Sequence, residues 1–138
     1  MKIELSRVSD TFHLEATNEG GNTVHLDASP DIGGTNKGMR PMQLLLTALG
    51  ACSSIDVINI LKKQKQDLKD IKITVTGERE KDAIPSLFVE AHLHFKLFGA
   101  IDHEKAQKAV SLAVEKYCSV AKTIEKTAKV SHSFEIVK

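Results

Sequence analysis

The longest apolar segment of the chain runs from Leu44 to Leu61. Its Leu, Ile, Val and Ala residues fall on nearly every side of a helix, and a helix that is apolar all round is normally buried. Pro41 suits the first turn of such a helix, and the cations that begin at Lys62 suit its C-terminal end. The pattern therefore predicts a long buried helix with Cys52 near its middle, around which the rest of the chain is wrapped.

Before this helix, apolar and polar residues alternate in three short segments, which cover residues 2–8, 11–17 and 23–28. Such alternation is typical of strands that bury one face. The glycine-containing segment Asn18–Asn22 predicts a tight turn between the second and third strands. The three strands are therefore expected to form an antiparallel meander, joined to the helix by a loop from Ser29 to Met39.

After the helix, the pattern predicts two longer strands, a second helix and a final strand; the strands lie at about 71–79, 87–97 and 129–137. Asp102 is expected to cap the second helix, whose apolar residues recur at helical spacing as far as Ala121. Residues 123–126 either continue that helix or form a short extra turn. The order βββ-α-ββ-α-β predicts the α+β fold class, with antiparallel sheets wrapped around the long helix.

The length of 138 residues predicts a single domain, 1–138. A helix that is apolar on every side needs cover on every side, and two short sheets with one other long helix supply too little of it. A second copy would cover the remaining face, because obligate interfaces resemble a domain core cut in half. We therefore expect a homodimer in which two central helices bury each other.

The composition argues against several kinds of partner. A net charge of +1 provides no basic surface for nucleic acid. The N-terminal segment MKIELSRVSD lacks the apolar core of a secretion signal, which predicts a cytoplasmic protein. Asp56 and Asn59 lie inside the apolar helix and disfavour a membrane span, because a carboxylate within a bilayer is costly.

Cys52 and Cys118 are the only cysteines, and their wide separation forms no CxxC motif. In a cytoplasmic chain such a pair is reduced, catalytic or metal-binding more often than structural, yet free cysteine is also a common core residue. Reaction requires the thiolate, which a nearby cation favours. Arg40 could supply that charge if its loop folds back or if it comes from a partner chain. Asp56, one turn after Cys52, would oppose thiolate formation and is expected to bond to backbone or to a cation.

Zinc is the metal that these residue types could bind in principle, with histidines joining the two cysteines: His92, His94, His103 and His132. No pair of these ligands has the close spacing of common zinc motifs. The segment GGTNKG precedes a helix but lacks the residue order of a phosphate-binding loop. We therefore expect no metal and no cofactor.

The segment GGTNKGMRPMQLLLTALGACSSIDVINILKK, followed by EKYCSVAKTI, resembles the OsmC/Ohr superfamily, and its YhfA-like branch in particular. The shared features are a glycine-rich loop, Pro41, a leucine- and alanine-rich helix that carries Cys52, and Cys118 followed by Val120. The resemblance covers nearly the whole chain. It implies an OsmC-like fold assembled as an intertwined homodimer with two central helices.

The resemblance also implies a thiol-dependent peroxidase that reduces organic hydroperoxides in oxidative-stress defence. In that scheme, Cys52 attacks the peroxide as a thiolate and becomes a sulfenic acid. Cys118 then condenses with it to form a disulfide, and an external dithiol reductant resets the pair. The implied partners are therefore a small hydroperoxide, a dithiol reductant and a second copy of the chain.

This chain departs from the peroxidase pattern in two places. Family peroxidases carry a glutamate directly after the proline, where this chain has Met42. They also use an arginine from an early strand, at a position that falls near residues 12–13 here. Arg7 and Arg40 are possible replacements for that arginine, and His13 is a weaker one. Because both cysteines remain, the peroxidase stays the leading interpretation. Two alternatives stand beside it: a non-catalytic dimer that binds an apolar small ligand or senses redox state, and a structural dimer whose cysteines only pack.

Overall fold

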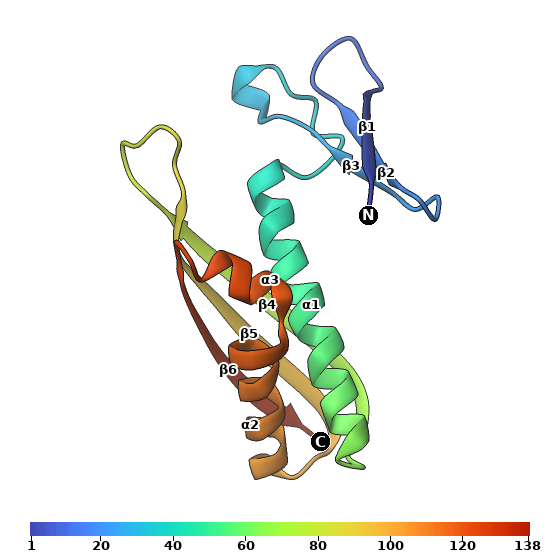
Figure 1. Ribbon diagram of the computed structural model, residues 1–138, viewed down its shortest axis with the longest axis vertical. Coiled ribbons are helices and arrows are strands. Elements are labelled where there is room, and N and C mark those ends of the chain that lie inside the picture. The colour runs from blue at the N-terminus through green and yellow to red at the C-terminus, as the bar shows by residue number, and fades with distance from the viewer. The chain divides into compact units, whose positions relative to one another are not determined.

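All 138 residues are described by the computed structural model. The chain divides into two compact units, Met1–Leu45 and Leu46–Lys138, and each unit contains one three-stranded sheet (Figure 1). The long helix α1 (Pro41–Lys63) begins at the end of the first unit and continues through the second. The bounds of this helix confirm the predicted position, and its last two residues are the expected lysines, but the chain itself buries only one side of it.

The first unit contains the predicted antiparallel meander, with strands in the order β1 (Ile3–Arg7), β2 (Leu14–Asn18) and β3 (Thr23–Leu26). The second strand begins three residues later than its alternating pattern suggests. The cause is a turn around Ser9, whose hydroxyl accepts the backbone N–H groups of Thr11 and His13 at 3.1 and 3.3 Å. Side-chain hydrogen bonds of this kind compete locally with strand pairing.

Asp27 organises the loop between β3 and α1, which includes the short 3₁₀ turn η1 (Pro30–Ile32). This carboxylate is buried, and its Oδ2 accepts the backbone N–H groups of Thr35 and Lys37, both at 3.1 Å. The Thr35 hydroxyl and the Ala28 N–H also donate to it. These hydrogen bonds, led by the one from Lys37, hold the pKa of Asp27 at about 2, because they favour the charged form.

The second unit contains the sheet β4-β5-β6, made of β4 (Asp67–Arg79), β5 (Phe88–Ala100) and β6 (Lys129–Val137). Strands β4 and β5 pair antiparallel, as predicted, whereas β5 and β6 pair parallel. The prediction of antiparallel sheets is therefore wrong for this last pair. The physical reason is that helices connect β5 to β6, and a helical crossover returns the chain in the same direction.

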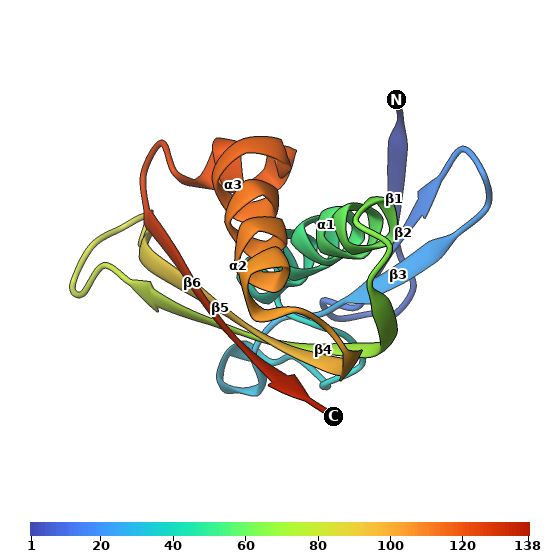
Figure 2. The same ribbon diagram turned by 90° about the horizontal axis from the view of Figure 1, so that it is seen from below.

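Helices α1, α2 (His103–Leu112) and α3 (Ser119–Ile124) lie on one face of this sheet (Figure 2). The Asp102 side chain accepts the Lys105 N–H at 3.0 Å, which confirms the predicted cap of α2. The core between sheet and helices is formed by fully buried aliphatic and aromatic side chains, among them Leu61, Leu93, Phe95, Leu97 and Val110. The absence of tryptophan is consistent with this mainly aliphatic core.

The continuous second helix predicted as far as Ala121 is wrong. Helix α2 ends at Leu112, and a π-helical turn η2 (Ala113–Tyr117) leads to Cys118, whose backbone is extended with φ −72° and ψ 108°. The Cys118 N–H bonds to the Ala113 carbonyl at 2.8 Å, five residues back, which adds one residue to the last turn. The short helix α3 begins directly after Cys118. Because helical residues lie on both sides of the break, the spacing of apolar residues alone did not reveal it.

One side of α1 packs closely on the sheet. A Cβ added at Gly50 would lie 2.9 Å from Val75 Cγ2, so the helix backbone approaches β4 as only glycine allows. Val57 and Leu61, which are also buried, lie further along the same side of the helix. On the opposite side, Ile55 and Ile58 are 66% and 41% exposed. The chain itself therefore covers only part of the surface of a helix that is apolar all round.

Helix α1 is also long and apolar enough to cross a membrane when judged by length and composition, with a mean hydropathy of 1.8. Core helices of globular proteins pass the same test. Here the buried side of α1 rests on the sheet of the second unit, and Asp56 interrupts its apolar surface. Both observations favour a core helix.

Candidate active site

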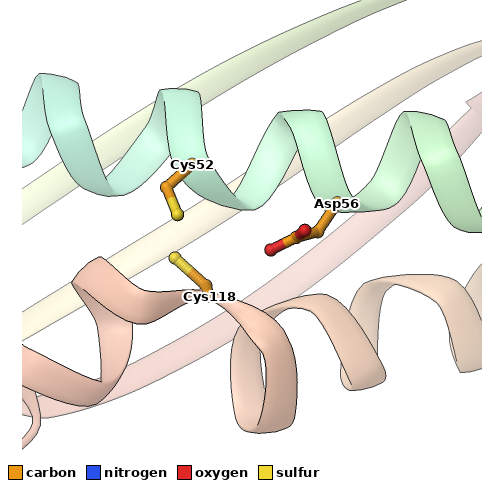
Figure 3. Close-up of side chains that lie close together, drawn as sticks. All are labelled: Cys52, Asp56 and Cys118. Carbon is orange, nitrogen blue, oxygen red and sulfur yellow. The ribbon is translucent and has the colours of Figure 1, made fainter.

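Two elements of the second unit bring three reactive or charged side chains together (Figure 3). Cys52 and Asp56 both belong to α1 and are four residues apart, so they lie on the same side of the helix, one turn from each other. Cys118 comes from the break between η2 and α3. The π-helical turn before Cys118 and the close approach of α1 to β4 therefore position the site.

The side chains of Cys52, Asp56 and Cys118 form a compact cluster. The two sulfur atoms and one carboxylate oxygen all lie within 4.8 Å of one another. In Figure 3 the two sulfurs point toward each other, and the carboxylate is directed toward Cys118. Both cysteines are free thiols. Formation of a disulfide from this state requires the sulfurs to approach to about 2.0 Å.

The two thiols differ in exposure, and burial changes the acidity of Cys118. Cys118 is fully buried, whereas Cys52 is partly exposed. Burial raises the pKa of the Cys118 thiol above its ordinary value, and the neighbouring Cys52 raises it further. Interactions with the Ser53 side chain and the Ala121 N–H partly offset this increase. Burial therefore disfavours the thiolate form of Cys118.

Backbone and side-chain groups hold Cys118 in place. The Ala121 N–H donates to Cys118 Sγ at 3.3 Å, so the thiol caps the first turn of α3. Ser53 lies next to Cys52 in the sequence and is also fully buried. Its hydroxyl has no hydrogen bond of regular geometry, although it interacts with the Cys118 thiol. The site thus contains a buried donor whose hydrogen-bonding capacity is incompletely used.

Asp56 does not have the partner that the sequence suggested. Its carboxylate forms no salt bridge and no hydrogen bond within the chain, so the expectation of a bond to backbone or to a cation is wrong for the isolated chain. The groups it faces are the two thiols. An unpaired, half-buried carboxylate is energetically costly, because it has lost part of its hydration without gaining a hydrogen bond or an ion pair.

The arginines with a predicted role belong to the first unit. Arg7 ends β1, and Arg40 directly precedes α1. The Arg40 guanidinium donates to the Gly38 carbonyl at 2.8 Å and to Asn36 Oδ1 at 3.1 Å, which stabilises the loop before the helix. Their predicted activating role at Cys52 stays a prediction.

The histidines do not join the cysteines. His92 bonds through its two ring nitrogens to the Ser131 and Ser133 hydroxyls, at 2.7 and 2.9 Å. His132 pairs with Glu115 at 3.2 Å. The ligand cluster around the two thiols contains Asp56 and no histidine. The cysteine–histidine zinc site considered from the sequence is therefore not formed.

Comparison with known proteins places this geometry in a family. The family model described as OsmC-like protein matches residues 34–133, a range that includes both cysteines and Asp56. Protein YhfA of Escherichia coli (strain K12) is 43% identical over 103 residues, which cover 74% of this chain and 76% of that protein.

Solved structures agree with this assignment. A hypothetical protein from Aquifex aeolicus VF5 superposes with a TM-score of 0.80 at 31% identity, over 99% of this chain and 97% of that one. The organic hydroperoxide resistance protein OhrB of Bacillus subtilis superposes with a TM-score of 0.69 at 20% identity, over 98% of each chain, and shows the shared fold. The resemblance seen in the sequence is confirmed, and this chain belongs to the OsmC/Ohr family of OsmC-like proteins, in its YhfA-like branch.

Proposed function

We propose that this protein is a cytoplasmic thiol-dependent peroxidase that reduces organic hydroperoxides in oxidative-stress defence. The observation that carries the proposal is the reduced pair Cys52 and Cys118, whose sulfur atoms lie within 4.8 Å of each other although they are 66 positions apart in the sequence. Two structural relatives, from Elizabethkingia anophelis and Bacillus subtilis, are described as organic hydroperoxide resistance proteins. At 16% and 20% identity they support the fold, so the cysteine geometry has to support the chemistry.

In the proposed reaction, the Cys52 thiolate attacks the outer oxygen of the hydroperoxide. The O–O bond breaks, the alkoxide leaves and takes up a proton as the alcohol, and Cys52 becomes a sulfenic acid. The Cys118 sulfur then attacks the Cys52 sulfur. The S–S bond forms as the S–O bond breaks, and the hydroxide leaves with the Cys118 proton as water. A dithiol reductant returns both cysteines to thiols and is itself oxidised to a disulfide.

The exposure of the two thiols and the raised pKa of Cys118 support an order for the two steps. Cys52 is partly exposed and can meet a peroxide from solvent, whereas Cys118 is fully buried. Burial also raises the pKa of Cys118, which disfavours the thiolate that a first attack requires. A buried neighbouring thiol is well suited to the second step, because its target is formed beside it. We therefore assign Cys52 as the attacking residue and Cys118 as the resolving residue.

The test is a thiol titration with intact mass before and after one equivalent of cumene hydroperoxide. We expect the loss of both thiols and of two mass units per chain. In Cys118→Ser, Cys52 should stop at the sulfenic acid, which a dimedone probe traps. In Cys52→Ser, turnover with a dithiol should be abolished. Turnover that survives in Cys52→Ser, or two intact thiols after prolonged exposure of the unchanged protein, would refute the proposal.

We also propose that the chain forms a homodimer and that the two units act as one domain within it. The exposed side of α1, which includes Ile55 and Ile58, supplies an apolar surface for a second copy. Light scattering at micromolar concentration should give twice the chain mass of 15.1 kDa. Ile55→Glu should shift the protein toward monomer, whereas Thr74→Glu on the exposed face of β4 should not. A monomeric unchanged protein would refute the dimer.

One observation favours a second candidate function, an apolar-ligand-binding dimer or redox sensor. Met42 stands where family peroxidases carry glutamate, which removes an acid that orients the peroxide. If both thiols survive exposure to hydroperoxide, this candidate replaces the first. A fluorescent fatty acid that binds to the reduced protein would then support it, because an apolar site between helices accepts such ligands.

A further inference from the structure

The cluster of Cys52, Asp56 and Cys118 has a ligand chemistry that peroxide reduction does not use. We propose that, in the reduced protein, these three side chains bind one thiophilic divalent cation, with Zn²⁺ as the cation that fits best. The proposal stands on the donor atoms, their distances and the unpaired groups around them. It does not depend on peroxidase activity.

The donor set matches the preferences of zinc. Zn²⁺ is bound in proteins by cysteine sulfur at about 2.3 Å and by carboxylate oxygen at about 2.0–2.2 Å, in a tetrahedral arrangement. Two sulfurs on one tetrahedral zinc ion are therefore about 3.8 Å apart, and a sulfur and an oxygen about 3.5 Å apart. The three donors already lie within 4.8 Å of one another. The remaining approach is at most about 1.0 Å for the two sulfurs and about 1.3 Å for a sulfur and an oxygen.

The charges around the cluster favour a cation. The carboxylate of Asp56 has no ionic or hydrogen-bond partner in the chain, although it is half-buried beside two thiols. Binding would convert both thiols to thiolates with release of two protons, because a coordinated thiol is deprotonated outright. The cation then neutralises most of the resulting negative charge. Without it, Asp56 faces two thiols, which are only weak hydrogen-bond donors.

A buried hydroxyl provides the second observation that points to a ligand. Ser53 is fully buried, has no hydrogen bond of regular geometry and interacts with the Cys118 thiol. A thiolate at Cys118 would accept a charge-assisted hydrogen bond from this hydroxyl, which the neutral thiol accepts only weakly. The hydrogen bond that the Ala121 N–H donates to the same sulfur, at 3.3 Å, would become stronger for the same reason. Both donors would then support a metal-bound sulfur.

The geometry indicates a site from which the metal ion can exchange with solvent. Three protein ligands leave the fourth position of a tetrahedral ion open to water or to a small external ligand, whereas purely structural zinc sites are closed by four. Cys52 is partly exposed and gives access from solvent. A disulfide between Cys52 and Cys118 would remove both thiolates, so oxidation and metal binding exclude each other.

The test titrates Cd²⁺ into the fully reduced protein under anaerobic conditions and follows the thiolate-to-metal charge-transfer absorption in the ultraviolet. We expect saturation at one equivalent per chain, with an intensity that corresponds to two thiolates. Zn²⁺ should displace Cd²⁺, and a chromophoric chelator then reports the zinc affinity. Affinity should rise with pH because protons are released on binding. Metal bound only by histidine, for example at the exposed His13–His25 pair, gives no thiolate-to-metal absorption and is therefore not counted.

Variants assign the ligands. Cys52→Ser and Cys118→Ser should each abolish the two-thiolate absorption. Asp56→Asn should weaken Zn²⁺ binding by at least about 10- to 100-fold, because even the loss of a group that only supports a zinc ligand costs that much. Asp56→Glu should recover part of the affinity, and Asp10→Asn, which removes an exposed carboxylate, should leave it unchanged.

Two outcomes would overturn the proposal: no charge-transfer absorption at one equivalent of Cd²⁺, or unchanged Zn²⁺ affinity in Asp56→Asn. Alkylation of the unchanged protein gives a test that needs no variant. One equivalent of Zn²⁺ should protect both cysteines from a maleimide, and full labelling in its presence would also overturn the site. These readouts involve no peroxide, so failure of the metal site and failure of the peroxidase are distinguishable.

Discussion

Substitution of Gly50 by alanine tests whether close packing of α1 on the sheet positions Cys52. In an exposed helix, glycine to alanine stabilises by about 0.8–1.0 kcal/mol. Here the added Cβ would lie 2.9 Å from Val75 Cγ2, whereas carbon atoms normally approach to about 3.5–4.0 Å. Val75 is β-branched and has little freedom to rotate away. The helix must therefore move by several tenths of an ångström.

The two effects can be compared in magnitude. Overpacking of this kind costs about 1–3 kcal/mol, and the gain in helix propensity offsets about 1 kcal/mol of it. We expect Gly50→Ala to lower the free energy of unfolding by about 1 kcal/mol, which corresponds to roughly 4 °C in Tm for a chain of this size. Because Cys52 is two residues away, disulfide formation with Cys118 should also slow.

The assay is urea unfolding of the unchanged protein, Gly50→Ala, Val75→Ala and the double variant. All four are measured at one fixed concentration, since the stability of the proposed dimer would depend on concentration. Val75→Ala removes the atom that the new Cβ would meet. In that background, Gly50→Ala should be neutral or stabilising, giving a coupling energy of about 1–2 kcal/mol. Equal destabilisation by Gly50→Ala in both backgrounds, or stabilisation of the unchanged protein, would refute the packing argument.

Three further predictions concern Asp27, the thiols and Arg40. The pKa of Asp27 is about 2, below its ordinary 3.8, so its carboxylate stabilises the loop fully above pH 4 and loses this effect as the pH falls through about 2. The protection of the Thr35 amide against hydrogen exchange should therefore fall over the same pH range. In Asp27→Asn this protection should not change with pH over that range. Iodoacetamide should label Cys52 before Cys118 in the native protein and both equally in urea; faster labelling of Cys118 would contradict the assigned order. Arg40→Gln should slow peroxide reduction by Cys52 at pH 7 by about tenfold, while Arg40→Lys retains most of the rate. If stopped-flow measurements give the same rate for Arg40→Gln and the unchanged protein, Arg40 is not the activating charge.

The sequence by itself determined the elements and the family. Alternation and helical spacing depend only on near neighbours, so the meander of the first unit, the long helix and β6 at 129–137 followed from the pattern. The Asp102 cap is equally local, because its partner lies three residues away. The resemblance to OsmC-like proteins rested on contiguous motifs around Pro41 and Cys52, and the comparisons confirm it.

Only the tertiary structure decided how distant segments meet. The sequence left open whether Cys52 and Cys118 approach each other, because their proximity depends on how α1 and the α2–α3 connection pack on one sheet. The break at Cys118 was hidden for a related reason. A π-helical turn adds one residue to a helical turn and so shifts every later residue, which apolar spacing does not reveal. Buried Cys118 also resembles a core residue of a continuous helix.

The role of Asp56 shows the same division. Its position one turn after Cys52 was visible in the sequence, and so was the expectation that a charge in an apolar helix has a partner. What it faces could be known only after Cys118 was placed beside it. Local patterns specify which side of an element is apolar, whereas the chemistry of a site depends on which other element covers that side.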